Sequence, residues 1–356
     1  MLSRESIADQ LKIGLQSAWY KRGLLSFLIS VLLWPLSQFY KFLAFTHRKL
    51  YQTGIFKVHT VSVPVVVVGN IVAGGGGKTP TVIALMQHLQ EQGVRVGVIS
   101  RGYGRTSDEC LQVKADSKVS DVGDEPCSML LAQNPLAHPA PVFVAKSRFE
   151  AASALLKTYP STQVIISDDG LQHHALQHDI AVTVFDDRGL GNGLLLPAGP
   201  LRESAVKTYN SLVLHTGNHA VKLTNTAAPQ FTTRRALASY ALRSDGSKVN
   251  LDALKPQTKL VALAGIANPA AFFEMLSHQG INLAKTLEFP DHYAFNSTLG
   301  SEYAGYTLIC TLKDAVKLWL VHPEALAVPL AFTPEPAFFT AFDDLLKPLL
   351  ATNSPT

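Results

Sequence analysis

The sequence predicts an α/β protein built on a mainly parallel sheet, and two observations carry this prediction. Residues 61–69 (VSVPVVVVG) and 163–170 (QVIISDDG) are short apolar runs rich in β-branched residues, which is typical of strands buried on both faces. Segments with helical spacing lie between such runs, as in residues 79–93 (TPTVIALMQHLQEQG). Strands and helices therefore alternate, and right-handed crossovers would connect parallel strands.

Length and composition are consistent with a globular core of two modest domains. The chain has 356 residues, of which 47% are hydrophobic. The net charge of +4 is too small to predict nucleic-acid binding, and it is compatible with an anionic surface or substrate. The three cysteines fit no metal-binding spacing and cannot all pair with one another, so we expect a reducing compartment.

The N-terminal segment predicts association with a membrane. Residues 24–45 (LLSFLISVLLWPLSQFYKFLAF) carry a single charge, and the uninterrupted apolar stretch ends near Pro35. This stretch is shorter than the roughly 20 residues of a spanning helix. Basic and aromatic residues flank it on both sides, which favours a helix that lies in or dips into one leaflet. A buried core helix is the alternative, and whether the helix spans the bilayer stays open.

The remaining elements define the expected domains. Further strands are expected at 141–145, 179–186, 209–217, 259–266 and 306–314, with helices in 148–160 and 269–279. The rhythm is lost around SDGS (244–247), which indicates a hairpin. We therefore expect an N-terminal membrane-associated helix (1–50), a core (55–225), a linker hairpin (226–255) and a smaller C-terminal α/β lobe (256–356).

Residues 69–81 (GNIVAGGGGKTPT) predict a phosphate-binding loop, although Val72 stands where the common G-x-x-x-x-G-K-[ST] pattern has glycine. The tract follows a buried strand and precedes a helix, so backbone N–H groups and the helix N-terminus can hold phosphates. A glycine-rich turn with an accidental lysine is the alternative. The expected nucleotide-binding residues are Gly74, Gly75, Gly76, Gly77, Lys78, Thr79 and Pro80. This loop predicts a P-loop NTPase-like parallel sheet core that binds ATP, with Thr79 also contacting Mg²⁺.

Two adjacent carboxylates predict a magnesium site near the loop. Asp168 and Asp169 follow the strand at 163–167, and ligands of open parallel sheets bind at the carboxyl ends of strands. Mg²⁺ is held by few carboxylates and keeps several waters. His173 lies five residues beyond Asp168 and could reach the same edge. The alternative is a solvated turn or a helix cap.

A third acidic element is GDEP at residues 123–126. Pro126 should restrict Glu125 to extended geometry. Asp124 and Glu125 could act as a general base and a metal ligand. Spacing alone does not distinguish this role from an ordinary turn.

The chain resembles the tetraacyldisaccharide 4′-kinase family, the lipid A 4′-kinases of Gram-negative bacteria. The resemblance rests on motifs in a consistent order between about residues 55 and 320, namely VPVVVVGNIVAGGGGKTP (63–80), VISRGYGR (98–105), VGDEP (122–126), AKSR (145–148), SDDGLQH (167–173), GNGLLLPAGPLRE (191–203), ALAGIANP (262–269), FPDHYAF (289–295) and TLKDAVK (311–317). Leu312 departs from the family, in which we expect glutamate. The family's own loop shares the missing glycine.

The resemblance implies transfer of the γ-phosphoryl group of ATP to the 4′-hydroxyl of a tetraacyldisaccharide 1-phosphate, which gives lipid IVA. It implies ATP and Mg²⁺ as cofactors, an acylated lipid substrate at the cytoplasmic face of the inner membrane, no nucleic acid and no obligate protein partner. Roles follow by motif: Asp124, oriented by His292, would accept the hydroxyl proton. Lys78 would bind phosphate in catalysis, and Glu125, Asp168 and Asp169 would shape the metal site. Arg101, Arg148 and His173 would contact the lipid or the developing charge. If Asp124 and His292 pair, the two lobes must close over ATP.

Three other classes of protein remain as alternatives. A different membrane-associated P-loop enzyme, such as a GTPase or a partitioning ATPase, is the first. A GTPase should carry a base-reading N-K-x-D motif; TLKD (311–314) is the nearest stretch, and its second residue is not what recognition would need. A nucleotide-gated membrane protein without catalysis would need the loop but not the acidic motifs together. A purely structural α/β protein is disfavoured because the acids gather at strand ends.

Overall fold

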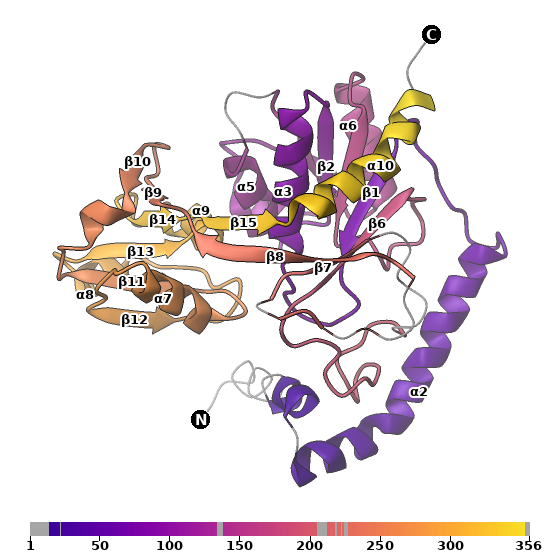
Figure 1. Cartoon of the computed structure of the whole chain (residues 1–356), viewed down its shortest axis with the longest axis horizontal. Coiled ribbons are helices and arrows are strands. Elements are labelled where there is room, and N and C mark those ends of the chain that lie inside the picture. Colours follow the sequence, from indigo (N-terminus) through magenta and orange to yellow (C-terminus); the bar gives the residue numbers. More distant parts are fainter. Residues whose placement is uncertain are drawn as a thin grey trace.

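The computed structural model describes residues 14–352, apart from 22, 134–137, 205–211, 218, 222 and 224–226. Within these residues the chain forms two lobes, and a long helix, α2 (Leu24–Gln52), runs along the outside of the larger one (Figure 1). The larger lobe is built on a nine-stranded sheet and the smaller lobe on a six-stranded sheet. The predicted α/β class with a parallel core and an N-terminal apolar helix is confirmed.

The larger sheet is centred on β1 (Val65–Gly69), which lies between β5 (Val164–Asp168) and β6 (Ile180–Phe185). Its order is β15-β8-β7-β6-β1-β5-β2-β4-β3. The other strands are β2 (Val96–Ser100), β3 (Leu111–Val113), β4 (Val142–Val144), β7 (Leu212–His215), β8 (Gln230–Leu237) and β15 (Leu330–Pro334). Only β3 and β15, the edge strands, pair antiparallel. The carboxyl ends of the inner strands therefore share one edge.

Helices bury both faces of this sheet, as the apolar strand sequences require. Val66 and Val68 of β1 pack into one core with α3 (Lys78–Glu91), α5 (Asp124–Leu131) and α10 (Pro336–Thr352). Val65 and Val67 face the opposite way and pack with α6 (Arg148–Thr158). A short helix, α4 (Val119–Val122), precedes α5. Alternate residues of a strand face opposite sides, so a strand covered on both sides is apolar throughout.

The smaller lobe repeats this arrangement. Its sheet order is β10-β9-β14-β13-β11-β12. Its elements are β9 (Tyr240–Leu242), β10 (Lys248–Asn250), the 3₁₀ helix η2 (Leu251–Leu254), β11 (Leu260–Ala264), α7 (Pro269–His278), β12 (Lys285–Glu288), α8 (Thr298–Glu302), β13 (Thr307–Thr311), α9 (Leu312–Leu318) and β14 (Leu326–Val328). Helix α7 covers one face, and α8 with α9 covers the other.

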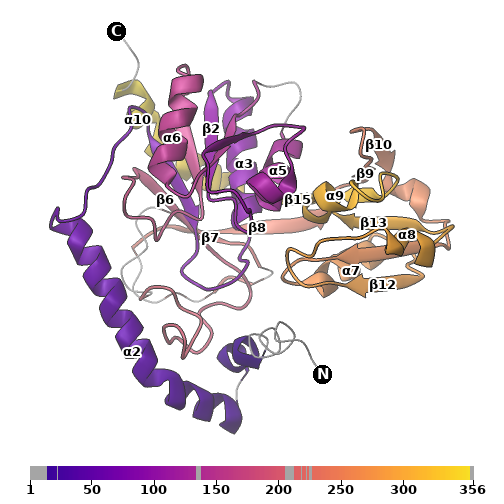
Figure 2. The same cartoon turned by 180° about the vertical axis from the view of Figure 1, so that it is seen from behind.

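Two segments pack differently from the expected domain division. In the region expected to be a linker hairpin (226–255), β8 joins the larger sheet by pairing with β7 and β15, while β9 and β10 pair within the smaller sheet. Figure 2 shows β8 and β15 running between the lobes. The last helix, α10, buries Phe338, Phe342 and Leu346 against the larger sheet. These residues recur every fourth position and form one apolar stripe, whose partner only the folded chain reveals.

Helix α2 leaves its apolar side chains exposed. It continues through Pro35 to Gln52 and bends along its length (Figure 1), as expected where a proline interrupts the backbone hydrogen bonds. Ser37 is its only buried residue, whereas Leu24 and Leu32 are 75% and 78% exposed. This exposure contradicts the buried core helix alternative. Among the described residues, α2 is the one helix that is long and apolar enough to cross a membrane, judged by length and composition alone.

Candidate active site

The glycine tract adopts a loop that only glycine can form at two positions. Gly74 and Gly77 have φ angles of 99° and 83°, in the left-handed region that disfavours other residues. A Cβ added to Gly77 would lie 2.8 Å from the hydroxyl of Thr216, which donates a 2.8 Å hydrogen bond to the carbonyl of Gly76. Asn70 Nδ2 donates to the carbonyl of Gly74 at 3.1 Å. The loop is therefore held from both sides.

The missing glycine at position 72 has a structural explanation. Val72 forms an antiparallel β-bridge with Leu201, and the backbone N–H of Ala73 donates to the carbonyl of Pro200 at 2.8 Å. The chain therefore stays extended until Ala73 and turns only afterwards. A β-branched residue suits this buried extended position.

Helix α3 begins at Lys78 directly after the loop, with Gly77 as its N-cap. Lys78 Nζ lies 3.6 Å from Asp169 Oδ2 and 3.4 Å from Asn70 Oδ1. Thr79 and Pro80 occupy the first turn, where N–H groups lack helical partners and can bind an anion. This strand–loop–helix arrangement is suited to binding the phosphates of a nucleotide.

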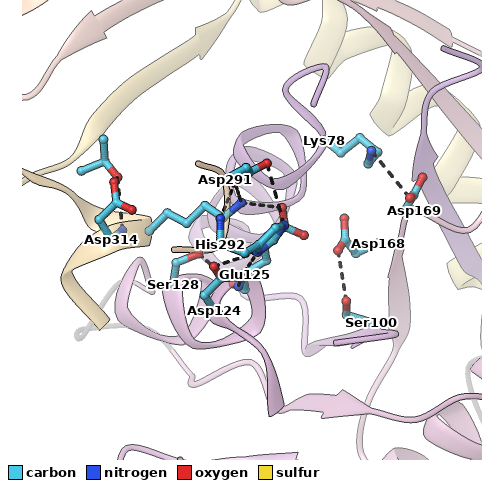
Figure 3. A network of polar contacts seen from close by, with 12 residues as sticks. Lys78, Ser100, Asp124, Glu125, Ser128, Asp168, Asp169, Asp291, His292 and Asp314 are labelled. Carbon is cyan, nitrogen blue, oxygen red and sulfur yellow. Dashed lines mark hydrogen bonds and ion pairs between the residues drawn. The ribbon is translucent and has the colours of Figure 1, made fainter. Parts of the chain in front are cut away.

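Asp168 is a buried carboxylate whose charge is poorly compensated. Ser100 Oγ donates to Asp168 Oδ2 at 3.1 Å, while Oδ1 is buried without a hydrogen-bond partner among the described residues. Burial raises the pKa of Asp168 to about 7, and the negative charges of Glu125 and Asp169 add to this effect. In Figure 3 Asp168 lies between Lys78 and the cluster around His292. A cation would satisfy its free oxygen.

Asp169 faces different partners because its backbone is left-handed, with φ of 46°. Its carboxylate lies 3.1 Å from Arg202 Nη1 and 3.6 Å from Lys78 Nζ. Burial opposes ionisation, but the charges of Lys78 and Arg202 outweigh it and lower the pKa of Asp169. Asp169 is thus an ionised carboxylate paired with two cations, whereas the carboxylate of the adjacent Asp168 forms no such ion pair.

Arg148 and His173 support the turn that carries the two aspartates. Arg148 is 4% exposed, and its Nη2 donates to the carbonyls of Asp168 at 2.8 Å and Asp169 at 3.3 Å. His173 Nε2 accepts from the Arg148 backbone N–H at 3.3 Å. Burial, then the charge of Arg148, lowers the pKa of His173 to about 4, so its ring is neutral at pH 7. Arg101 is exposed and free to meet an anion. The burial of Arg148 favours holding the turn over contacting substrate.

Asp124 and Glu125 open a helix, which corrects the expectation of an extended Glu125. Helix α5 begins at Asp124 after Gly123, whose φ of 93° allows the sharp turn. Pro126 occupies the first helical turn, where its missing N–H removes no helical bond. The local preference of the residue before proline is overridden because the helix packs against the core, where Asp124 is 4% exposed.

Asp124 pairs with His292 across the two lobes (Figure 3). His292 Nδ1 lies 2.9 Å from Asp124 Oδ2, and Lys317 Nζ lies 3.1 Å from the same oxygen. Burial opposes ionisation of Asp124, but the hydrogen bond with His292 and the charges of Lys313 and Lys317 hold its pKa well below the usual range. The pairing joins a helix of the larger lobe to a loop of the smaller one, so the two lobes meet at this site.

The TLKDAVK motif supplies the cations of this cluster. Lys313 Nζ lies 2.8 Å from Asp291 Oδ1 and 3.4 Å from Glu125 Oε1. Asp314 Oδ2 accepts from the Gly265 backbone N–H at 3.1 Å and so ties α9 to the loop after β11. Leu312 packs against the apolar core of the smaller lobe. An apolar residue suits that position.

Three basic residues of this region were not predicted from the sequence to belong to the site. Lys317 lies four residues after Lys313 on α9, and this spacing places both on one helical face. Arg202 belongs to the GPLRE motif, but its proximity to Asp169 depends on the fold. Arg188 pairs with Asp186 at 2.7 Å and donates to the carbonyl of Gly75, so its guanidinium lies at the phosphate loop.

The residues present fit a magnesium ion that is completed by phosphate oxygens. Among the described residues, no group of three or more His, Cys, Asp or Glu side chains could hold a metal ion without other ligands. Mg²⁺ commonly takes one or two carboxylates and fills its other positions with water and phosphate oxygens. The free oxygen of Asp168 meets that requirement.

Comparison with known proteins decides the family. The sequence profile described as Tetraacyldisaccharide-1-P 4'-kinase matches residues 29–347. The chain belongs to the tetraacyldisaccharide-1-P 4'-kinase family. It is 52% identical over 340 residues to the tetraacyldisaccharide 4'-kinase of Polaromonas sp. (strain JS666 / ATCC BAA-500), covering 94% of this chain and 96% of the relative. It is 41% identical over 305 residues to that of Shewanella halifaxensis (strain HAW-EB4), covering 84% and 86%.

A solved kinase of the same family has the same fold. The crystal structure of "apo" form LpxK from Aquifex aeolicus in complex with ATP is similar with a TM-score of 0.74 and 28% identity, covering 91% of this chain and 99% of that one. Membership of a kinase family makes the chain an enzyme. It removes the alternatives of a GTPase, a non-catalytic gated binder and a structural protein.

Proposed function

We propose that this chain transfers the γ-phosphoryl group of ATP to the 4′-hydroxyl of a tetraacyldisaccharide 1-phosphate. Relatives at 41–52% identity carry the name of this activity, and a solved relative is titled as an ATP complex. The observation that carries the proposal is the convergence of the phosphate loop, the Asp168–Asp169 turn and the Asp124–His292 pair at one edge of the larger sheet. Phosphoryl transfer needs mainly positioning and charge neutralisation, and this arrangement offers both.

In the proposed mechanism Asp124 receives the proton of the sugar 4′-hydroxyl. The hydroxyl oxygen forms a bond to the γ-phosphorus while the bond to the β–γ bridging oxygen breaks, and ADP leaves. Asp124 is ionised and ready to accept because His292 and Lys317 contact its oxygens. His292 holds the carboxylate in place and can share the proton through Nδ1. General bases of this kind contribute about 10²–10⁴-fold to rate.

Lys78 and the N-terminus of α3 would bind the β- and γ-phosphates. Thr79, Asp168, Asp169 and Glu125 would hold Mg²⁺, which when bound would neutralise charge on the phosphate oxygens. Arg101, and His173 as a neutral hydrogen-bonding group, remain candidates for contact with the lipid. Arg202 is placed to hold Asp169 in orientation through its 3.1 Å contact.

We further propose that α2 brings the enzyme to the cytoplasmic face of the inner membrane. Its exposed apolar side chains, such as Leu24, Leu28 and Leu32, would enter the acyl region. An acylated disaccharide stays in the bilayer, so the enzyme must reach it there. The helix is fastened to the active-site lobe by Ser37 Oγ and Tyr40 OH, which donate to the carbonyls of Leu195 and Arg202 at 2.9 Å each.

The test is transfer of label from γ-radiolabelled ATP to tetraacyldisaccharide 1-phosphate in detergent micelles, with Lys78→Ala and Asp124→Asn proteins beside the parent. Labelled lipid that requires Mg²⁺ and is lost in both variants supports the proposal. ATP binding by the parent without lipid labelling would refute it.

A further inference from the structure

A short helical segment before α2 is anchored in the larger lobe and has no role in the mechanism above. Residues 14–20 are helical. Trp19 is 6% exposed, and its Nε1 donates to the carbonyl of Pro197 at 3.0 Å. In α2, by contrast, Ser37 is the only buried residue. Residues 14–20 therefore belong to the folded lobe, and the apolar surface proposed for the membrane follows them in the chain.

Tyr20, the last residue of this segment, packs against the residues that lead into the phosphate loop. Its ring lies against a small buried cluster that contains Ile71, Val72 and Leu201. Ile71 and Val72 lie just before the glycine tract, and Leu201 forms the β-bridge with Val72. The same cluster therefore holds both the entry to the loop and the side chain of Tyr20.

Arg188 connects the Tyr20 ring to the loop itself. Its guanidinium carbon lies 5.6 Å from the centroid of that ring, within the range of a cation–π interaction. The guanidinium also pairs with Asp186 at 2.7 Å and donates through Nη2 to the carbonyl of Gly75. A Cβ added to Gly74 would lie 2.9 Å from Arg188 Nη1. The guanidinium thus lies directly against the phosphate loop.

The contact between Arg188 and the Gly75 carbonyl sets the direction of an N–H group in the loop. In a planar trans peptide the C=O and the N–H of the next residue point in opposite directions. A Gly75 carbonyl directed at Arg188 therefore directs the Gly76 N–H away from Arg188. The next peptide is held in the same way, because Thr216 donates to the carbonyl of Gly76 at 2.8 Å and so orients the Gly77 N–H. N–H groups with fixed directions can bind phosphate oxygens without reorganisation.

We propose that Arg188 and Tyr20 are positioning residues of the phosphate loop, and that residues 14–20 thereby form part of the nucleotide site. This inference rests on the proposed ATP-dependent function and adds a support of the loop from the N-terminal segment. Arg188 fixes the peptide between Gly75 and Gly76, while Tyr20 and Asp186 hold the guanidinium in place. Arginine suits this role because its planar fork offers several donors in a fixed geometry.

Equilibrium binding of ATP and of inorganic tripolyphosphate, which lacks the nucleoside, tests the proposal without requiring catalysis. Loss of the support should weaken both ligands by the same factor, because the loop binds phosphates. We expect about tenfold for Arg188→Met and about fivefold for Tyr20→Leu. Tyr20→Phe keeps the ring and loses only a hydroxyl that has no hydrogen-bond partner among the described residues, so it should restore parental binding. Arg243→Met, at an exposed arginine, is the matched control.

The double variant Tyr20→Leu with Arg188→Met tests whether the two residues act through one contact. Tyr20 supports the loop by holding the guanidinium, so its replacement should have little further effect once Arg188 is absent. The double variant should therefore bind ATP about as Arg188→Met does. Independent effects would multiply to about fiftyfold, and that result would overturn the inference.

Thermal unfolding and hydrogen exchange separate positioning of the loop from general stability. Tyr20→Leu keeps an apolar side chain against the cluster, so we expect an unfolding temperature close to that of the parent and faster exchange confined to amides 73–78. Faster exchange throughout the larger lobe would overturn the inference, because the role of Tyr20 would then be structural.

The binding data distinguish failure of this inference from failure of the proposed function. Unchanged affinity for both ligands in Arg188→Met and Tyr20→Leu would overturn the inference and leave the kinase function standing. Weakening of ATP alone would also overturn it, because the two residues would then act on the nucleoside and not on the loop. A parent protein that binds neither ligand would overturn both.

Discussion

The Asp124 carboxylate on α5 and the His292 ring in the smaller lobe form a 2.9 Å contact, although 168 residues separate them along the chain. Each lobe supplies one residue of the pair. The contact therefore makes the catalytic proposal depend on how the lobes are placed by β8 and β15, the strands that run between them (Figure 2).

Replacement of Asp124 by asparagine should lower kcat about 10³-fold, because the amide cannot accept the hydroxyl proton. ATP affinity should stay within twofold of the parent, since Asp124 faces His292 and Lys317 and not the loop. Single-turnover transfer and equilibrium nucleotide binding check these two expectations. Asp116→Asn, at an exposed turn, is the control and should leave both unchanged. Full activity of Asp124→Asn would refute the role of Asp124 as base.

His292 has a left-handed backbone with φ of 64°, so the choice of substitution matters. Asparagine tolerates this conformation, whereas a β-branched residue does not. His292→Asn should retain the fold and lower kcat about 10²-fold, and His292→Val should in addition reduce thermal stability. Thermal unfolding and steady-state kinetics compare the two. Equal thermal stability of the two variants would argue against strain at this position.

Lys78→Ala should lower kcat about 10²–10³-fold and weaken ATP binding, because it removes the cation that we propose binds the phosphates. It also removes a charge that stabilises ionised Asp169. Lys146→Ala, at an exposed lysine, is the control. Filter binding of labelled ATP provides the measurement. If ATP binding and turnover were retained in Lys78→Ala, the loop would not be the phosphate site.

Leu32→Glu should weaken binding to phospholipid vesicles about tenfold or more, because it places a charge on the apolar surface of α2. Leu320→Glu in the smaller lobe is closely matched, since Leu320 is 75% exposed and Leu32 is 78% exposed. Only the first substitution should reduce co-sedimentation with vesicles. An equal reduction in both proteins would contradict α2 as the membrane-binding element.

Acid should destabilise the enzyme through His174. Burial, then the charge of Arg48, lowers the pKa of His174 from 6.5 to about 4. The unfolded chain binds this proton more readily, so stability present above pH 6.5 is lost as the pH falls towards 4. Because the ring is partly solvated, we expect its share to be about 1 kcal/mol.

Urea unfolding of the parent and His174→Gln at about pH 7.5 and about pH 4.5 measures this share. The decrease in unfolding free energy on acidification should be smaller in His174→Gln. His219→Gln, at an exposed histidine, is the control and should behave as the parent. An identical decrease in all three proteins would show that His174 does not contribute.

Much of the larger lobe follows from the sequence because its signals are local. The alternation of β-branched runs with helical spacing predicted β1, α3, β2 and β5 in order, and the glycine tract predicted the turn before α3. At Gly77 the local backbone itself favours glycine, because its φ of 83° lies in the left-handed region that most side chains disfavour. The prediction of extended geometry for Glu125 was wrong, because the packing of α5 against the core overrides the local preference of a residue before proline.

By itself the sequence determined the α/β class, the phosphate loop, the acids at strand ends and the apolar α2, since each depends on residues close together in the chain. The tertiary structure decided which long-range partners meet: Arg202 with Asp169, Lys317 with Asp124, and α10 with the larger sheet. Such contacts depend on the register of β8 and β15 and on buried surface shared by distant segments. The sum of many weak packing terms sets these features, and no short stretch of sequence encodes that sum.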